Sequence, residues 1–296
     1  MQDIQDQLRN LQPAHEFLVA IDSDGCAFDT MEVKHKECFI PNIINHWGLQ
    51  PIAKYARAAA EFVNLYSQWR GINRFPALTM TFDLLSAWPE VQRRHFQVPD
   101  AESLRDWIKH ETKLGNPALQ AEIARTGDAT LKKALSWSEA VNKTIAEMVH
   151  DVPPFPFVRE SLAAVYPWAD ILVCSATPSA ALEREWEEHA IARFTVAIAG
   201  QEHGSKREQL ALVKDKYPPG KVLMIGDALG DMQAAHSNGL LFYPVNPGQE
   251  EESWAEFFQQ YAELFRSGAY SRQIEQELIT KFEKFLPATP PWQKIK

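Results

Sequence analysis

Short apolar runs alternate with amphipathic stretches in two parts of this chain. The run from Phe17 to Ile21 predicts a strand over residues 16–22, after a short amphipathic helix from Ile4 to Leu11. The same alternation resumes after residue 157. We expect strands over residues 171–174, 195–199, 222–225 and 240–243, and helices over residues 158–166, 179–190, 206–216 and 230–237. Alternating strands and helices favour one parallel sheet with right-handed crossovers.

The stretch between these parts, residues 30–157, has a different pattern. Its apolar residues recur at helical spacing, as in Phe39, Ile43 and Trp47, which predicts a module of roughly five to seven helices. Prolines are expected to mark the breaks between them, at Pro41, Pro51, Pro76, Pro89, Pro99 and Pro117. The proline-rich segment 152–157 is predicted to be a stiff linker that closes the module.

The sequence therefore predicts an α/β core that is interrupted after its first strand by a helical domain. The core comprises residues 1–30 and 158–296, and the helical domain comprises residues 31–157. Residues 249–285 read as two amphipathic helices that pack on the core. We interpret Trp88, Trp107 and Trp137 as core residues of the helical domain rather than as a binding platform.

Two acids follow the first strand directly. Asp22 and Asp24 are two residues apart, so both side chains lie on one side at the carboxyl end of the strand, where open α/β sheets build their sites. Carboxylates this close need a cation or a proton between them. Gly25 then allows a sharp turn beneath the pair. The alternative is a turn at the strand end with only a capping role.

The later strands also end in residues that can carry chemistry. Ser175, Ala176 and Thr177 offer hydroxyl and backbone N–H groups before a helix, which suits an oxyanion. The alternative is that Thr177 or Ser179 only caps that helix. Lys206 opens the next helix, and its position at the unfavourable end of the helix dipole slightly favours a partner anion, although such a lysine is often only solvated.

A second pair of acids follows the strand predicted over residues 222–225. Asp227 comes at the end of the strand and Asp231 follows one helical turn later, so both can face one metal site. The alternative is a turn acid followed by an acid at a helix N-terminus.

The order of these residues resembles that of the haloacid dehalogenase (HAD) superfamily of phosphohydrolases. The resemblance covers residues 17–30 and about 170–246, and lies in Asp22-Ser23-Asp24-Gly25, Leu172–Thr177, Lys206 and Gly226-Asp227 followed by Asp231. It implies a Rossmann-like parallel sheet with an inserted all-helical cap, of the type inserted after the first motif. Such a cap closes over the site and selects the leaving group.

The resemblance also implies roles for the matching residues. Asp22 would be the nucleophile that forms an aspartyl-phosphate, and Asp24 the general acid and base. Mg²⁺ would be held by the Asp22 carboxylate, the Asp24 backbone carbonyl and Asp227, with Asp231 in support. The phosphoryl group would be bound by Ser175, Ala176, Thr177 and Lys206, with Ser175 and Lys206 offsetting its charge in the transition state.

Candidate substrate contacts lie in the helical domain. Arg70, Asn73 and Arg74 place two cations and an amide beside a glycine, which makes them candidate substrate contacts. The alternative is a helix C-terminus with arginine side chains near its carbonyls. His35 and Lys36 are candidate contacts near the start of the cap, or else part of a solvated helix face. At position 26, where many relatives carry Thr or Val, this chain has Cys26, and we expect little change in chemistry.

Composition narrows the classes of partner. The formal net charge is −9 and the chain shows no Lys/Arg-rich stripe, so nucleic acid is not an expected partner. Three cysteines, Cys26, Cys38 and Cys174, are too few for a disulfide framework and read as reduced thiols. The N-terminus has no export signal and no apolar run is long enough to span a bilayer, so we expect a cytoplasmic protein without a membrane partner.

The expected function is a Mg²⁺-dependent phosphohydrolase that acts on a small phosphorylated metabolite. A phosphomutase with the same core is an alternative, and so is a binding or regulatory protein that retains the fold with little turnover. Dehalogenases and phosphonate-cleaving enzymes of this fold lack an acid at the second position, so Asp24 argues against both.

Overall fold

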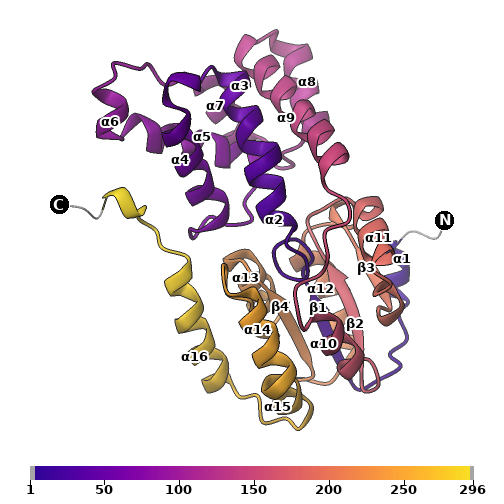
Figure 1. The fold of residues 1–296 in the computed structure, drawn as a ribbon. Coiled ribbons are helices and arrows are strands. Elements are labelled where there is room, and N and C mark those ends of the chain that lie inside the picture. The colour runs from indigo at the N-terminus through magenta and orange to yellow at the C-terminus, as the bar shows by residue number, and fades with distance from the viewer. Residues whose placement is uncertain (1–3, 294–296) are drawn as a thin grey trace. The chain divides into compact units, whose positions relative to one another are not determined.

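A parallel β-sheet forms the centre of the first of two units in this protein (Figure 1). The computed structural model describes residues 4–293. Within that range the sheet has five strands, in the order β3-β2-β1-β4-β5, and all neighbouring strands are parallel. They are β1 (Phe17–Ile21), β2 (Ala169–Cys174), β3 (Ala197–Ala199), β4 (Val222–Gly226) and β5 (Leu241–Pro244). The predicted fold class, a parallel α/β sheet, is confirmed.

The strands are buried on both faces, which explains why they read as continuous apolar runs. Val19 and Ile21 of β1 join one apolar cluster, whereas Leu18 and Ala20 join another on the opposite face. The first cluster includes residues of α10 (Val158–Val165) and α11 (Ser179–Glu188), and the second includes residues of α1 (Ile4–Arg9), α12 (Lys206–Val213) and α13 (Leu229–Ser237).

The carboxyl ends of the three central strands meet at one edge of the sheet. β1 lies between β2 and β4, and Ile21 is in register with Val173 on one side and Ile225 on the other. Residues that follow these strands therefore lie next to one another, although they are far apart in sequence.

The chain after β5 packs on the sheet as two helical stretches. The first comprises α14 (Glu250–Glu256), the π-helical turn η6 (Phe257–Tyr261) and α15 (Ala262–Arg266), and the second comprises α16 (Arg272–Phe282) and the 3₁₀ turn η7 (Glu283–Phe285). Trp254 lies in the first apolar cluster and donates its indole N–H to the carbonyl of Cys26 at 2.7 Å, and Phe282 lies in the second. The tail thus supports the turn after β1.

The second unit is helical and comprises residues 32–150 together with the C-terminal segment from residue 287. Its helices are α2 (Thr30–Val33), which begins in the first unit, α3 (Ile40–Trp47), α4 (Ala53–Leu65), α5 (Arg74–Ser86), α6 (Pro89–Gln92), α7 (Glu102–His110), α8 (Asn116–Thr126) and α9 (Ala129–Met148). Trp88, Trp107 and Trp137 are buried in the apolar core of this unit, in agreement with their interpretation as core residues.

Pro41 does not break the helix in which it lies, contrary to the prediction. α2, the π-helical turn η1 (Lys34–Phe39) and α3 follow one another without interruption. Proline in an α-helix clashes with the carbonyl four residues earlier. Here the preceding turn is wider, and the N–H of Ile40 donates to the carbonyl of His35, five residues back. By contrast, Pro51, Pro89 and Pro117 lie in the first turn of their helices.

The segment 152–157 belongs to the sheet unit, and the boundary between the units lies at residues 150 and 151 rather than at 157 and 158. The N–H of Phe155 donates to the carbonyl of Ala27 at 2.9 Å, and Pro154 forms a β-bridge with Phe28. These backbone contacts hold the segment against the turn that follows β1, so it is part of the sheet unit rather than a linker between the units.

Residues 287–293 group with the helical unit, whereas the prediction placed them in the core. The carbonyl of Pro287 accepts from the N–H of Gln68 at 3.4 Å. Trp292 stacks on Trp88, with ring centroids 4.1 Å apart and ring planes 11° from parallel, and meets the edge of Phe62. No periodic pattern in the sequence indicates that these rings are in contact, so the sequence alone does not place residues 287–293 in the helical unit.

Trp292→Ala is expected to destabilise the helical unit by about 1–3 kcal/mol, because it removes a half-buried ring that packs on Trp88 and Phe62. Limited proteolysis followed by peptide mapping should show faster cleavage within residues 32–150. Trp168→Ala, which removes a ring packed on Phe17 and Phe265 of the sheet unit, is the matched control. Unchanged cleavage within residues 32–150 in Trp292→Ala would contradict this expectation.

Candidate active site

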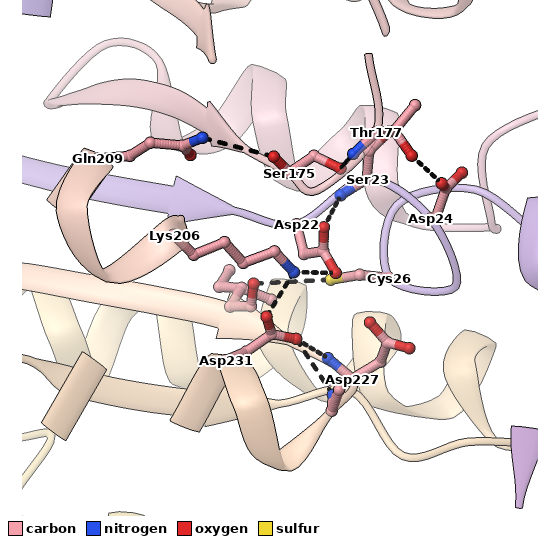
Figure 2. A network of polar contacts seen from close by, with 12 residues as sticks. Asp22, Ser23, Asp24, Cys26, Ser175, Thr177, Lys206, Gln209, Asp227 and Asp231 are labelled. Atoms are coloured by element: carbon pink, nitrogen blue, oxygen red, sulfur yellow. Dashed lines mark hydrogen bonds and ion pairs between the residues drawn. The ribbon is translucent and has the colours of Figure 1, made fainter. Parts of the chain in front are cut away.

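Asp22 comes directly after β1 and remains attached to the sheet. Its backbone N–H donates to the carbonyl of Ile225 at 3.0 Å, so its position is fixed by β4. The residue is 5% exposed. One carboxylate oxygen, Oδ1, accepts the N–H of Ser23 at 2.7 Å, and the other, Oδ2, lies 2.6 Å from Nζ of Lys206 (Figure 2). The carboxylate is therefore oriented by a backbone donor and a cation.

Asp231 shapes the neighbouring loop after β4. Its Oδ2 accepts the N–H groups of Asp227 at 3.2 Å and Ala228 at 3.1 Å, and its Oδ1 lies 2.5 Å from Nζ of Lys206. Gly226 leaves room for this arrangement, because a Cβ atom at that position would lie 2.4 Å from Cβ of Asp231. Asp231 thus holds both the loop that carries Asp227 and the lysine.

Three buried carboxylates converge at this edge of the sheet. Oxygens of Asp22, Asp227 and Asp231 lie within 4.8 Å of one another. Burial raises the pKa of Asp22 well above its usual range; the charge of Lys206 lowers it, and those of Asp231 and Asp227 raise it further. Burial lowers the pKa of Lys206, but the attraction of Asp22 and Asp231 outweighs burial and raises it overall.

The donor set fits a divalent cation. With all three acids ionised, the single positive charge of Lys206 leaves an excess of negative charge in a buried site. Carboxylate oxygens are ligands that Mg²⁺ prefers in proteins, and a bound divalent ion would balance this excess. Asp22 and Asp227 would hold the ion, and Asp231, which is already engaged with Lys206 and two N–H groups, would support them.

Asp24 lies apart from this group of carboxylates. Its Oδ2 accepts from the hydroxyl of Thr177 at 2.5 Å, and its Oδ1 accepts from the hydroxyl of Thr30. Figure 2 shows its carboxylate turned toward Thr177. The two acids of the first motif therefore occupy different surroundings, one beside the lysine and the other between two hydroxyls.

The loop after β2 lies beside the turn after β1. Ser175 is buried, and its Oγ accepts the N–H of Thr177 at 3.2 Å, while Ala176 is exposed. The alternative of simple capping is wrong, because α11 begins after Pro178 without any side-chain cap. Instead, Ser179 contacts Glu202 and His203.

Lys206 is not a solvated residue at a helix start. Its side chain is 16% exposed and reaches between Asp22 and Asp231. Ser205 and Glu208 form a capping box that begins α12 at this residue. The helix start thus directs the lysine to the carboxylates.

Two residues that support the first motif were not singled out from the sequence. The Oγ of Ser23 accepts from the indole N–H of Trp186 at 2.9 Å and donates to Glu185 at 3.1 Å, so α11 holds the turn between the two acids. Thr30 contacts Asp24. The only signal was a hydroxyl between two acids and another at the start of the next helix.

The candidate substrate residues of the helical unit have structural contacts of their own. Arg70 is buried and donates to the carbonyl of Leu65 at 2.9 Å, where α4 ends. Asn73 caps α5 by accepting the N–H of Phe75. Arg74 donates to Ser138 and Asn142 of α9. The contact of Arg70 agrees with the alternative of a helix C-terminus, whereas Asn73 and Arg74 lie at the start of α5. Because all three side chains have structural partners, they are not part of the proposed function.

The remaining candidates also have internal partners. Lys36 pairs with Glu32 and donates to the hydroxyl of Tyr66 at 3.3 Å, and His35 stacks on Phe39. Cys26 is buried, and burial followed by the charge of Asp227 raises the pKa of its thiol. Cys26 is therefore a neutral packing residue beneath the acids.

Comparisons with known proteins identify the fold. A scan against protein-family models gives no match. A search of curated proteins gives none either. Among solved structures, a protein from Bacteroides fragilis described as a haloacid dehalogenase-like hydrolase is 16% identical, with 80% of this chain and 92% of that chain covered and a TM-score of 0.50.

Two further solved structures are similar at lower scores. A HAD-hydrolase from Bacillus subtilis, bound to magnesium, is 11% identical over 83% of this chain and 99% of that chain, with a TM-score of 0.48. A haloacid dehalogenase-like family hydrolase from Xanthomonas campestris is 15% identical over 79% of this chain and 84% of that chain, with a TM-score of 0.42. The likeness to the Bacteroides fragilis protein shows that this chain has the haloacid dehalogenase-like fold.

In residues 4–293, no helix is both long and apolar enough to cross a bilayer.

Proposed function

We propose that this protein is a Mg²⁺-dependent phosphohydrolase that removes phosphate from a small phosphorylated metabolite. The observation that carries the proposal is the convergence of Asp22, Asp227, Asp231 and Lys206 at the carboxyl edge of the sheet. A nucleophilic carboxylate, a fixed cation and a set of oxygen ligands are the parts that phosphoryl transfer through an enzyme carboxylate needs.

The reaction has two steps. An oxygen of Asp22 attacks phosphorus, the bond from phosphorus to the leaving oxygen breaks, and Asp24 gives its proton to that oxygen. Asp24, now a carboxylate, takes a proton from water, whose oxygen attacks the phosphorus of the aspartyl-phosphate. Phosphate is released and the Asp22 carboxylate is restored. Bound Mg²⁺ supplies positive charge to the phosphoryl oxygens.

Lys206 has two functions in this scheme. Its ammonium group lies 2.6 Å from Asp22 and favours the ionised, nucleophilic form, which lowers the pKa of that carboxyl against the effect of burial. It also offsets the charge that develops on the phosphoryl oxygens. Ser175, whose hydroxyl lies in the adjoining loop, is the proposed second contact to phosphate.

Asp227→Asn tests the metal requirement. Removing one of the carboxylate charges is expected to raise the Mg²⁺ concentration for half-maximal hydrolysis of 4-nitrophenyl phosphate by about tenfold or more. Mg²⁺ should also raise the thermal midpoint of the parent, and raise that of the variant less at the same concentration. Asp83→Asn, which changes an exposed acid of the helical unit, is the control. A parent that hydrolyses the ester equally well in excess chelator would contradict the metal requirement.

A further inference from the structure

The hydroxyl of Thr177 contacts a carboxylate at a position where the sequence predicts a contact to phosphate. Thr177 Oγ1 donates to Asp24 Oδ2 at 2.5 Å, and the other oxygen of that carboxylate accepts from Thr30 (Figure 2). Asp24 and Thr177 come from the loops after β1 and β2, which are adjacent strands of the sheet. The hydroxyl thus joins two loops of the site.

The backbone of Thr177 is fixed independently of this contact. Its N–H donates to the hydroxyl of Ser175 at 3.2 Å, and its carbonyl accepts the N–H of Gln201 at 3.0 Å. Gly200 allows this close approach, because a Cβ atom there would lie 2.6 Å from the carbonyl oxygen of Thr177. The backbone N–H and carbonyl of Thr177 are therefore both hydrogen-bonded, and its hydroxyl contacts Asp24 from a fixed backbone.

The turn that carries Asp24 is also held from α11. Ser23, the residue before Asp24, is fully buried and hydrogen-bonded to Trp186 and Glu185 of that helix. The segment from the end of β2 through α11 therefore fixes the backbone of the turn through Ser23 and the side chain of Asp24 through Thr177.

We propose that Thr177 is a positioning residue that holds the Asp24 carboxyl group for proton transfer, and this inference rests on the proposed function. A hydroxyl can both donate and accept a hydrogen bond, so Thr177 can remain in contact with Asp24 before and after Asp24 gives up its proton. When the proton has passed to the leaving oxygen, the Thr177 hydroxyl donates to the carboxylate that remains. The same contact orients that carboxylate to take a proton from water in the second step.

The leaving group distinguishes this role from phosphate binding. Nitrophenol leaves readily as its anion and needs no proton from the enzyme. The oxygen of benzyl alcohol is a poor leaving group and must receive a proton as the bond to phosphorus breaks. Thr177→Val keeps the shape of the side chain and removes the hydroxyl. We expect it to lower kcat for benzyl phosphate by about tenfold or more with little change in KM. Formation of the aspartyl-phosphate from 4-nitrophenyl phosphate, followed as release of nitrophenol in a single turnover, should change much less.

Two control variants separate positioning from a general structural effect. Thr177→Ser restores the hydroxyl and should recover most of the activity on benzyl phosphate. Thr195→Val makes the same change at a half-buried threonine of the same unit, whose hydroxyl donates to the carbonyl of Ala192, and should leave the ratio of the two activities unchanged.

Other outcomes overturn the inference. If Thr177→Val raises KM for both esters and weakens inhibition by inorganic phosphate, the hydroxyl binds phosphate instead. If it leaves both activities unchanged, or lowers both equally without recovery in Thr177→Ser, Thr177 does not position Asp24. A parent no faster than Asp22→Asn on either ester overturns the proposed function itself, which distinguishes the two failures.

Discussion

Asp22→Asn is expected to lower the rate of 4-nitrophenyl phosphate hydrolysis by about a thousandfold or more, without lowering the stability of the metal-free protein. The amide has nearly the same shape as the carboxylate, but it is a far weaker nucleophile. Removing one of the buried negative charges also relieves repulsion from Asp227 and Asp231. Lys206 loses one partner but keeps Asp231 at 2.5 Å. Activity and stability should therefore change independently, which is typical of a functional site.

Asp170→Asn is the matched control for this prediction, because it changes another buried aspartate of the same sheet. Its carboxylate accepts from the N–H of Ala14 at 3.0 Å and the hydroxyl of Tyr217 at 2.8 Å, and it meets His15 at 3.0 Å. Both oxygens of the Asp170 carboxylate face donors, whereas an asparagine side chain has only one acceptor oxygen. Asp170→Asn should therefore lower the free energy of unfolding by about 1–3 kcal/mol. Hydrolysis per folded molecule should stay near that of the parent.

Chemical denaturation in chelator measures the stability of both variants, and initial rates in Mg²⁺ measure their activity. If Asp22→Asn retained the activity of the parent, Asp22 would not be the nucleophile. If it unfolded as readily as Asp170→Asn, the three acids would not repel one another as the charge count requires.

Gly226→Ala is expected to lower both the stability and the activity of the protein. The added methyl group would lie 2.4 Å from Cβ and 2.6 Å from Oδ2 of Asp231, so one of the two must move. Moving Asp231 releases the N–H groups of Asp227 and Ala228 and one partner of Lys206. We expect a loss of about 1–3 kcal/mol in stability from overpacking, and at least a roughly tenfold loss of activity from the displaced lysine.

Gly230→Ala provides the control for this variant within the same segment. Gly230 lies in the first turn of α13, and a Cβ atom there meets nothing within 4 Å. Alanine should therefore stabilise the helix by about 0.5–1 kcal/mol and leave activity unchanged. Equilibrium denaturation and initial rates compare the two alanines directly. Equal stability and equal activity of the two variants would show that the position of Asp231 does not require a glycine at residue 226.

The sequence predicted the positions of the strands well, because a strand buried on both faces reads as an unbroken apolar run. Phe17–Ile21 and Val222–Gly226 are such runs. It also predicted which strand ends carry polar side chains. The order of the strands does not follow from the apolar pattern, since pairing depends on contacts between segments far apart in the chain, such as Ile21 with Val173.

The features that the sequence did not reveal depend on single long-range contacts. The contacts of Thr177 with Asp24 and of Trp292 with Trp88 each join segments that no local pattern relates. Pro41 was read as a break because proline usually ends a helix, but the π-helical turn before it relieves the clash. For Arg70 the sequence allowed either a substrate contact or a place at a helix C-terminus, and its hydrogen bond to the carbonyl of Leu65, where α4 ends, agrees with the second.

Binding of a divalent ion between Asp22 and Asp227 is the central claim, and anomalous diffraction from crystals soaked in Mn²⁺ tests it most directly. Mn²⁺ prefers the same oxygen ligands as Mg²⁺ and gives an anomalous signal that locates it without reference to the protein atoms. We predict one strong peak in coordination contact with both carboxylates, and its loss in crystals of Asp227→Asn. A peak that contacts neither Asp22 nor Asp227, or the absence of any peak at this edge of the sheet at saturating Mn²⁺, would contradict the proposed metal site and the reaction built on it.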